Sequence, residues 1–225
     1  MMPPVHEAPA VRAIHEDAHL LVLDKPAGLL CVPGRGADKQ DCLSTRARMW
    51  WPDALVVHRL DMSTSGLVLM ARSPAMQRAL GDAFAMRLVD KRYEAVVDGL
   101  MPVSEEWAVI DAPLIADWPR RPLQKIDPEG KPSQTRWRAL RQLPHDHATH
   151  VLLEPLTGRS HQLRVHLASI GHAILGDALY ASDAARRRAP RLMLHATSLA
   201  FMHPATMLPM RFESPAPFVE VALRS

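Results

Sequence analysis

The sequence is poor in cysteine and has no long apolar run, and these absences exclude several classes of protein. Its two cysteines, Cys31 and Cys42, do not form a Cys-x-x-Cys motif, so neither a disulfide framework nor a structural zinc site is indicated. No apolar run approaches the roughly 20 residues that a helix needs to cross a bilayer. Residues 1–7 lack the basic and apolar regions of a signal peptide. We therefore expect a cytoplasmic protein without a membrane partner.

Several common catalytic and ligand-binding motifs are also missing. The chain contains no Gly-x-Gly-x-x-Gly, no phosphate-loop lysine motif and no Gly-x-Ser-x-Gly nucleophile motif. His161 and His166 are five residues apart, whereas two metal ligands on one helical face would be three or four apart. The sequence therefore predicts no nucleotide-binding loop, no serine nucleophile and no metal site.

The composition is that of a globular protein with a mild excess of positive charge. Apolar residues make up 48% and charged residues 23% of the 225 residues, which is enough for a substantial core. A net charge of +3 permits a polyanionic partner without requiring one. Two stretches are rich in basic residues: Arg120, Arg121, Lys125, Lys131, Arg136, Arg138 and Arg141, and then Arg186, Arg187, Arg188 and Arg191. Each of them is either a phosphate-binding patch or an ordinary solvated face.

The most informative stretch is residues 57–66, Val-His-Arg-Leu-Asp-Met-Ser-Thr-Ser-Gly. It precedes the apolar run 67–70, which has the length of a buried strand, so the loop is held by a rigid element. Asp61 is the best candidate in it for a base or a nucleophile. The alternative is a solvated turn in which Arg59 and Asp61 form a surface ion pair worth less than ~1 kcal/mol.

A second polar stretch, residues 155–167, follows a strand-like run at 151–154. Thr157 or Ser160 could cap a helix in this stretch, and Gly171 would end it.

Two side chains of this second stretch are candidates for the same site as Asp61. His161 and Arg164 are three residues apart and are neighbours on a helix. If the two loops meet, Arg164 favours the ionised form of Asp61 and lowers its pKa.

The remaining pattern predicts an α+β fold with an extensive, mainly antiparallel sheet. Apolar runs at 20–23 and 29–32 flank the turn 25–28, and residues 93–99 and 135–140 alternate in part. These segments are typical of strands.

One clear helix begins at Ser73-Pro74, because serine is a good N-cap and proline suits the first helical position. Apolar residues then recur at helical spacing on the face that we expect to meet the core: Met76, Leu80, Ala83, Phe84 and Leu88.

Residues 117–122, Asp-Trp-Pro-Arg-Arg-Pro, combine an aromatic ring and two arginines on a loop that proline stiffens. Trp118, Arg120 and Arg121 could stack on or pair with nucleotides. A tryptophan that anchors the core is the rival interpretation.

Taken together, five motifs in this order resemble the RluA family of pseudouridine synthases, over nearly the whole chain from Ile14 to Phe218. The branch of the family that it resembles most is the dual-specificity one. The matching segments are His58-Arg59-Leu60-Asp61 with Thr64-Ser65-Gly66, Lys91-Arg92-Tyr93, residues 158–166, Gly176-Asp177 with Tyr180, and residues 191–196.

The resemblance implies that the protein isomerises uridine to pseudouridine in RNA without a metal or other cofactor. Asp61 matches the catalytic aspartate, which either attacks the ribose C1′ or removes the 2′ proton. Tyr93 matches the tyrosine that stacks on the base, and Arg164 the arginine that pairs with the aspartate. Arg59 matches the residue that enters the RNA when the uridine is flipped out.

The resemblance also implies a mixed, mainly antiparallel sheet with flanking helices around a central RNA cleft. The expected targets are a uridine in a tRNA anticodon loop and one in a 23S rRNA hairpin. Residues 117–122 and 130–132 resemble an RNA-contacting insertion of the dual-specificity branch. The expected RNA contacts are His58, Arg59, Thr64, Trp118, Arg120, Arg121, Lys131, Arg159, His161 and Gln162.

We expect residues 14–225 to form a single catalytic domain and residues 1–13 to be an N-terminal extension, too short for the S4 RNA-binding domain of many relatives. The resemblance favours a monomer. Two alternatives within RNA biology stay open, a non-catalytic RNA-binding protein and an RluA-family synthase with another target. A metal-dependent phosphodiesterase is a third, although its ligand set is not evident.

Overall fold

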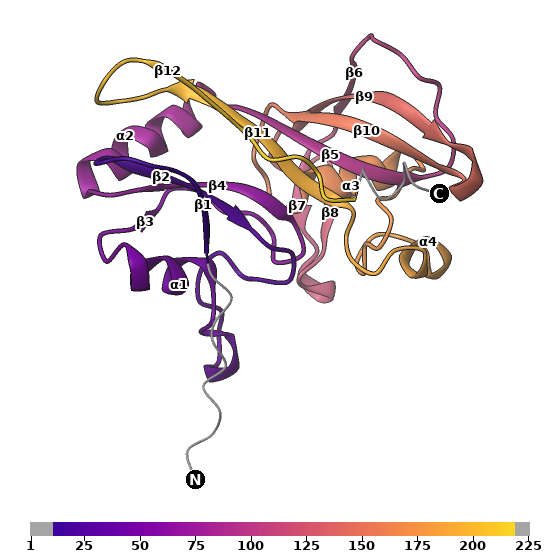
Figure 1. The fold of residues 1–225 in the computed structure, drawn as a ribbon. Coiled ribbons are helices and arrows are strands. Elements are labelled where there is room, and N and C mark those ends of the chain that lie inside the picture. Colours follow the sequence, from indigo (N-terminus) through magenta and orange to yellow (C-terminus); the bar gives the residue numbers. More distant parts are fainter. Residues whose placement is uncertain (1–10, 219–225) are drawn as a thin grey trace.

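Strands dominate the fold and helices are few, as the sequence predicts (Figure 1). The structure is a computed structural model that describes residues 11–218. The strands are β1 (Arg12–Glu16), β2 (Leu20–Lys25), β3 (Leu55–Val56), β4 (Ser65–Ala71), β5 (Asp90–Asp98), β6 (Ala108–Asp111), β7 (Leu114–Ala116), β8 (Gln124–Ile126), β9 (Gln134–Leu143), β10 (Ala148–Pro155), β11 (Leu194–Met202) and β12 (Pro209–Glu213). The α-helices are α1 (Leu43–Trp50), α2 (Pro74–Ala85), α3 (Gln162–Ser169) and α4 (Asp183–Arg187).

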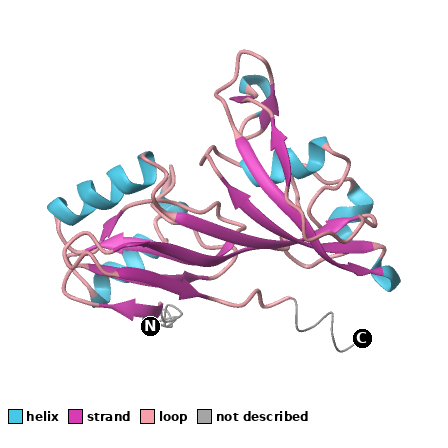
Figure 2. Ribbon diagram, turned by 90° about the horizontal axis from the view of Figure 1, so that it is seen from above, coloured by secondary structure: helices cyan, strands magenta, loops and turns pink. Residues whose placement is uncertain are grey.

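One ten-stranded sheet runs through the molecule, and β7 and β8 form a separate hairpin. The main path of the large sheet is β1-β2-β4-β11-β5-β10-β9-β6, with β3 beside β4 and β12 beside β11. We call the part with β1 to β4 the first half and the part with β5, β10, β9 and β6 the second half; β11 joins the two. Neighbours are antiparallel except β4 and β11, which are parallel. Figure 2 shows this continuous sheet with helices lying along it. The predicted α+β fold with a mixed, mainly antiparallel sheet is confirmed.

The centre of the first half of the sheet, strand β4, is covered on both faces. Every residue of β4 is buried, as expected for a strand with packed layers on each side. Leu67 and Leu69 belong to the core cluster that includes Leu80 of α2, whereas Val68 and Met70 belong to the cluster that includes residues of α1. In the second half, α3 packs its apolar side chains against β5 and β10.

The N-terminal end of α2 forms as predicted, but its C-terminal end comes earlier. The Ser73 side chain accepts a hydrogen bond from the backbone N–H of Met76. The helix ends at Ala85, and Leu88 is 63% exposed instead of meeting the core. The turn that follows has Arg87 in the left-handed region, which ends the helical register before Leu88.

Two other local predictions are wrong. Residues 29–32 form an isolated bridge between Leu30 and Cys42 rather than a strand, because this segment pairs with the loop before α1. Neither Thr157 nor Ser160 caps α3; the N-cap is His161, which has a left-handed backbone and no side-chain cap. β1 begins at Arg12, two residues before the predicted start of the catalytic domain, and residues 1–10 of the predicted extension lie outside the described part. The division into an extension and one catalytic domain stays a prediction.

Gly66 lies where β4 meets β11, and we expect it to be irreplaceable. Its φ of 109° is rare for L side chains, and a Cβ there would collide with the Ala196 backbone of β11. We predict that Gly66→Ala lowers the free energy of unfolding by on the order of 3 kcal/mol, measured by urea titration.

Gly81→Ala is the matched control, because Gly81 lies inside α2 with open space around the position of a Cβ. This variant should be about 0.5–1 kcal/mol more stable than the parent protein. Equal effects of the two substitutions would contradict the argument from the β4–β11 contact.

Candidate active site

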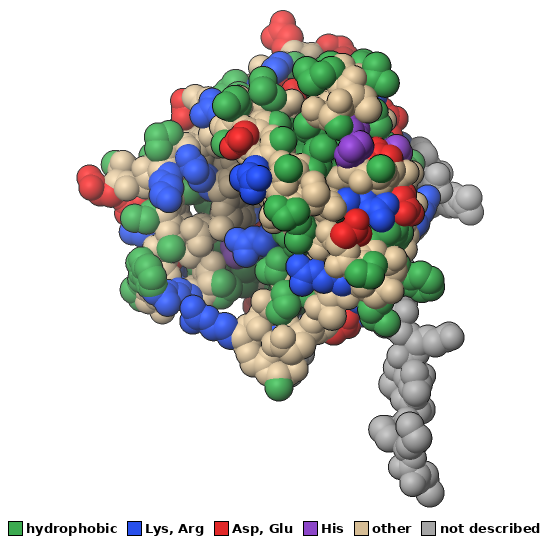
Figure 3. Space-filling view, turned by 90° about the vertical axis from the view of Figure 1, so that its left-hand side faces the viewer, with side chains coloured by type: hydrophobic (Ala, Val, Ile, Leu, Met, Phe, Trp, Pro, Cys, Tyr) green, Lys and Arg blue, Asp and Glu red, His purple; other side chains and the backbone are tan. Residues whose placement is uncertain are grey.

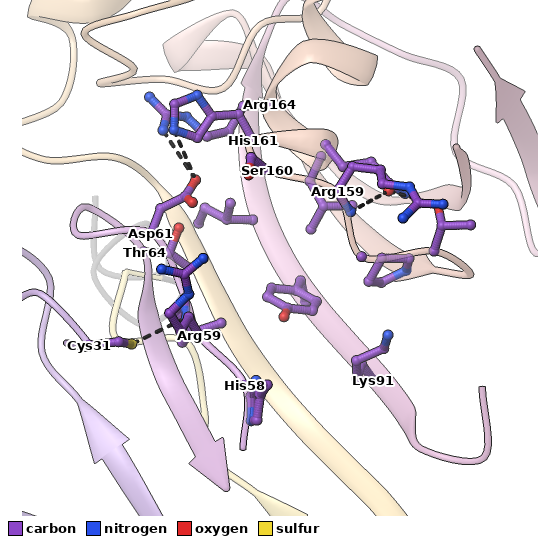
Figure 4. Close-up of a pocket in the computed structure, with 18 of the residues that line it drawn as sticks. Cys31, His58, Arg59, Asp61, Thr64, Lys91, Arg159, Ser160, His161 and Arg164 are labelled. Carbon is purple, nitrogen blue, oxygen red and sulfur yellow. Dashed lines mark hydrogen bonds and ion pairs between the residues drawn. The ribbon is translucent and has the colours of Figure 1, made fainter. Parts of the chain in front are cut away.

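A pocket of about 710 Å³ lies between the two halves of the molecule. The loop before β4 lines one side, and the segment that leads into α3 lines the other (Figure 4). β5 contributes Lys91 and Tyr93. The two polar stretches found in the sequence therefore meet, although about a hundred residues separate Asp61 from Arg164 along the chain.

Asp61 and Arg164 form the predicted ion pair across this pocket. An Arg164 Nη1–H donates to Asp61 Oδ2 at 3.2 Å. The Arg164 side chain is 4% exposed and that of Asp61 is 27% exposed. The carboxylate thus faces the pocket while its partner is held in the protein. A ligand in the pocket can therefore reach the Asp61 carboxylate while Arg164 fixes its orientation.

Arg164 is itself fixed by Asp177, a role that the sequence reasoning missed. Its Nε–H and an Nη2–H donate to the two carboxylate oxygens of Asp177 at 2.8 and 2.7 Å, and the Asp177 side chain is 1% exposed. Burial lowers the pKa of Arg164, but bonding to Asp177 and Asp61 outweighs this and raises it. The Gly176-Asp177 motif was visible in the sequence, but its distance along the chain from Arg164 did not indicate that Asp177 and Arg164 form a pair.

His161 and Tyr180 complete the surroundings of the carboxylate. The Nε2 atom of His161 lies 3.9 Å from Asp61 Oδ2, and its Nδ1 lies 2.6 Å from the Tyr180 hydroxyl oxygen. The Tyr180 ring lies 5.2 Å from the Arg164 guanidinium. Burial lowers the pKa of His161, and the charge of Arg164 lowers it further against the opposing effect of Asp61. The imidazole is therefore neutral at neutral pH.

Tyr93 offers a neutral aromatic ring to the pocket. Burial raises the pKa of its hydroxyl well above the usual range, and the Asp61 carboxylate raises it further. The phenol therefore stays protonated at neutral pH. Its place on β5, in the middle of the sheet, fixes the ring more firmly than a loop would.

Lys25 holds the loop that carries Asp61 and was also missed. Its side chain is fully buried, and the ammonium donates to the carbonyl oxygens of Pro26, Leu29 and Met62 at 2.9, 2.8 and 3.1 Å. Burial lowers the pKa of Lys25 to about 8. The sequence signal was a lysine directly after an apolar run and before Pro-Ala-Gly, which we interpreted only as a turn.

Three of the expected RNA contacts, His58, Thr64 and Gln162, line the pocket but are packed or bonded within the protein. The His58 Nε2 accepts the N–H of Leu69, its ring stacks on Phe84, and burial lowers its pKa to about 3. Thr64 is 3% exposed. The Gln162 amide makes four hydrogen bonds with residues 134, 135, 157 and 159. These side chains line the pocket and also shape the two loops, and their contact with RNA stays a prediction.

The rim of the pocket is basic. Arg59 and Arg159 are exposed lining residues, and among the described residues Arg59 has no hydrogen bond or ion pair of its side chain. Arg87 and Lys91, which the sequence reasoning did not select, line the same pocket. Figure 3 shows Lys and Arg side chains gathered around a hollow on one face. The arrangement suits a polyanion.

The other expected RNA contacts do not line the pocket. Trp118, Arg120 and Arg121 lie on the turn of the β7–β8 hairpin, and Lys131 pairs with Leu114 beside it. Trp118 is 65% exposed, and the Arg121 guanidinium lies 3.1 Å from the centre of its ring. The core-anchoring interpretation of Trp118 is therefore wrong.

Residues 19–169 match the family model of RNA pseudouridylate synthases. The chain belongs to this family. It is 46% identical over 213 residues to the dual-specificity RNA pseudouridine synthase RluA of Escherichia coli strain K12. The aligned residues cover 94% of this chain and 96% of that protein. The RluA protein of Vibrio parahaemolyticus is 48% identical over 195 residues, covering 85% and 77%. The predicted RluA-family resemblance is confirmed.

Solved structures give the same result. Human RNA pseudouridylate synthase domain containing 1 is 29% identical with a TM-score of 0.78, covering 99% of this chain and 89% of that one. Human RNA pseudouridylate synthase domain containing 4 is 25% identical with a TM-score of 0.73, covering 94% and 91%. The chain is therefore a pseudouridine synthase, an isomerase that acts on RNA.

Residues 11–218 contain no group of three or more His, Cys, Asp or Glu side chains that could hold a metal ion. The same residues include no helix that is long and apolar enough to cross a membrane.

Because Arg164 and Asp177 are both buried, we predict that Arg164→Met costs stability as well as activity. It leaves Asp177 without its partner, which should lower the free energy of unfolding by about 3–5 kcal/mol. Adding Asp177→Asn removes the second charge and should restore at least about half of that loss. Chemical unfolding of both variants measures the effect; a double variant less stable than Arg164→Met would refute the pairing argument.

Proposed function

We propose that this enzyme converts a flipped-out uridine to pseudouridine in the pocket around Asp61. In this reaction the bond between N1 of uracil and C1′ of ribose breaks, and a bond between C5 and C1′ forms. The proton on C5 leaves, and N1 gains one, so the product is an isomer of the substrate. No external oxidant, reductant or group donor is required, and we propose that no metal or cofactor takes part.

The observation that carries this proposal is the position of the Asp61 carboxylate. It reaches the pocket while Arg164, and through it Asp177, keeps it in place. Attack on C1′ and removal of the 2′ proton both need an ionised carboxylate beside the ribose. The hydrogen bond from a buried guanidinium fixes the direction of the carboxylate oxygen atoms.

The Tyr93 ring suits the base of the flipped nucleotide. The phenol is protonated and the side chain is rigidly held on β5, so a uracil can stack on an uncharged ring. We propose that Tyr93 holds the base during its rotation between the two glycosidic bonds.

Arg59 is placed to enter the RNA where the flipped base leaves the stack. Its side chain is exposed at the rim while its neighbour Asp61 is turned to Arg164. Flipping a paired or stacked base costs a few kcal/mol. A planar guanidinium that stacks in the vacated position offsets part of that cost.

The β7–β8 hairpin supports a structured RNA as the substrate. One face of Trp118 is covered by Arg121 and the ring is mostly exposed, so its other face can stack on a nucleotide. The relatives are named as dual-specificity enzymes. We propose a tRNA anticodon stem-loop and a 23S rRNA hairpin as the two substrates, bound by a monomer in the cytoplasm.

Release of tritium from RNA labelled at uridine C5 tests the proposal. We predict release by the parent protein that persists with EDTA and falls to background in Asp61→Asn. Arg164 keeps its Asp177 partner in this variant, so its free energy of unfolding should change by less than about 1 kcal/mol.

Asp53→Asn is the matched control, because Asp53 pairs with Arg72 in a partly exposed ion pair outside the pocket. It should release tritium at the parental rate. RNA binding without release by the parent protein would favour a non-catalytic binder. Chain cleavage that EDTA abolishes would favour a phosphodiesterase.

Arg59→Ala tests the division of labour in the catalytic loop. We predict that it weakens binding of the stem-loop by about 1–3 kcal/mol, as expected for one lost stacking contact. Asp61→Asn should bind with the parental affinity. Fluorescence anisotropy with a labelled stem-loop measures both; an equal loss of affinity in both variants would contradict separate roles.

A further inference from the structure

The hydroxyl of Tyr180 lies between the β7–β8 hairpin and the catalytic carboxylate, outside the pocket itself. It accepts a hydrogen bond from the backbone N–H of Gln124 in β8 at 2.9 Å. On its other side it lies 2.6 Å from Nδ1 of His161. The Tyr180 N–H in turn donates to Asp177 at 3.2 Å. This side chain therefore contacts the hairpin, the buried ion pair and the histidine next to Asp61.

These contacts decide which tautomer His161 adopts. Because the Tyr180 oxygen already accepts the Gln124 N–H, its own hydrogen needs an acceptor. Among the described residues the only acceptor within hydrogen-bond distance of this hydroxyl is His161 Nδ1. With this acceptor, Tyr180 donates to Nδ1. A neutral imidazole with Nδ1 as acceptor carries its hydrogen on Nε2.

The Nε2 atom is the one that faces Asp61. It lies 3.9 Å from Oδ2, the same oxygen that accepts from Arg164 (Figure 4). With hydrogen on Nε2, the ring presents a positive dipole end to the carboxylate. The other tautomer would present a lone pair and repel it. The hydroxyl of Tyr180 thus controls the sign of this interaction.

We propose that Tyr180 is a positioning residue that holds His161 in the Nε2–H tautomer and thereby connects the seating of the β7–β8 hairpin to the electrostatics of Asp61. The proposal rests on the function proposed above, because it gives the hairpin an RNA-binding role. When RNA engages the turn around Trp118, it acts on an element that is one hydrogen bond away from Tyr180. The contacts Gln124–Tyr180, Tyr180–His161 and His161–Asp61 thus connect the RNA-binding hairpin to the catalytic carboxylate.

The test is Tyr180→Phe, which keeps the ring beside the Arg164 guanidinium and removes only the hydroxyl. Long-range proton–nitrogen correlation spectra of the ¹⁵N-labelled free protein at pH 7.5 report the His161 tautomer, assigned by comparison with His161→Ala. We predict Nε2–H alone in the parent protein and a mixture, or Nδ1–H, in Tyr180→Phe. A parent protein in the Nδ1–H form, or an unchanged tautomer in the variant, would overturn the proposal.

Kinetics give a second readout that loss of packing alone would not produce. The single-turnover rate of tritium release in Tyr180→Phe should fall about tenfold, the effect of losing one hydrogen bond that acts on a charged group. The rate is measured with saturating stem-loop, so that any weaker binding caused by losing the Gln124–Tyr180 hydrogen bond does not enter it. Adding Tyr180→Phe to His161→Ala should cause no further loss of rate. Independent losses in the double variant would show that Tyr180 does not act through His161.

Thr45→Val is the control for removing a hydroxyl, since Thr45 on α1 lies outside the pocket and donates to the carbonyl oxygen of Gln40 in the preceding loop. It should match the parent protein in tautomer and rate. The two proposals fail separately. Without tritium release by the parent protein, the proposed function fails, and the spectra still decide the tautomer. With parental release and an unaffected Tyr180→Phe, only the present inference fails.

Discussion

The interaction on which the site depends is the buried pair between Arg164 and Asp177. A guanidinium that is 4% exposed cannot remain in the protein without a fixed anionic partner. Asp177 provides that partner through two parallel hydrogen bonds. With two of its donors taken, Arg164 has a single orientation and directs a further donor at Asp61. The reactive carboxylate is thus oriented by a charge that cannot move away from it.

The same constraint explains how neighbouring residues in one short loop serve different purposes. Asp61 is turned into the protein toward Arg164, and Arg59 is turned out to the rim. Between them Leu60 is buried, and its N–H donates to the Cys31 sulfur at 3.2 Å. Lys25 holds the Met62 carbonyl on the other side of Asp61. The loop is fixed on both sides of the residue that must be placed most accurately.

The sequence predicted what depends on local pattern and on motif order. The apolar run 67–70, the cap at Ser73 and the Asp61–Arg164 pair are all present in the structure. What it could not predict depends on contacts between distant segments. Burial of Asp177, and the bond between Gln124 and Tyr180, arise only when the halves of the sheet are assembled. Gln162 looked available as a polar residue, yet its amide is fully used by backbone and side chains of other elements.

The position of β11 in the sheet has a consequence for the order of synthesis. This strand lies between β4, which follows the Asp61 loop, and β5, which leads to the half with Arg164, and it comes after both catalytic residues in the sequence. A growing polypeptide therefore contains Asp61 and Arg164 before it contains the strand that joins their supports. The sheet that carries the two residues becomes continuous only when β11 has been made and inserted.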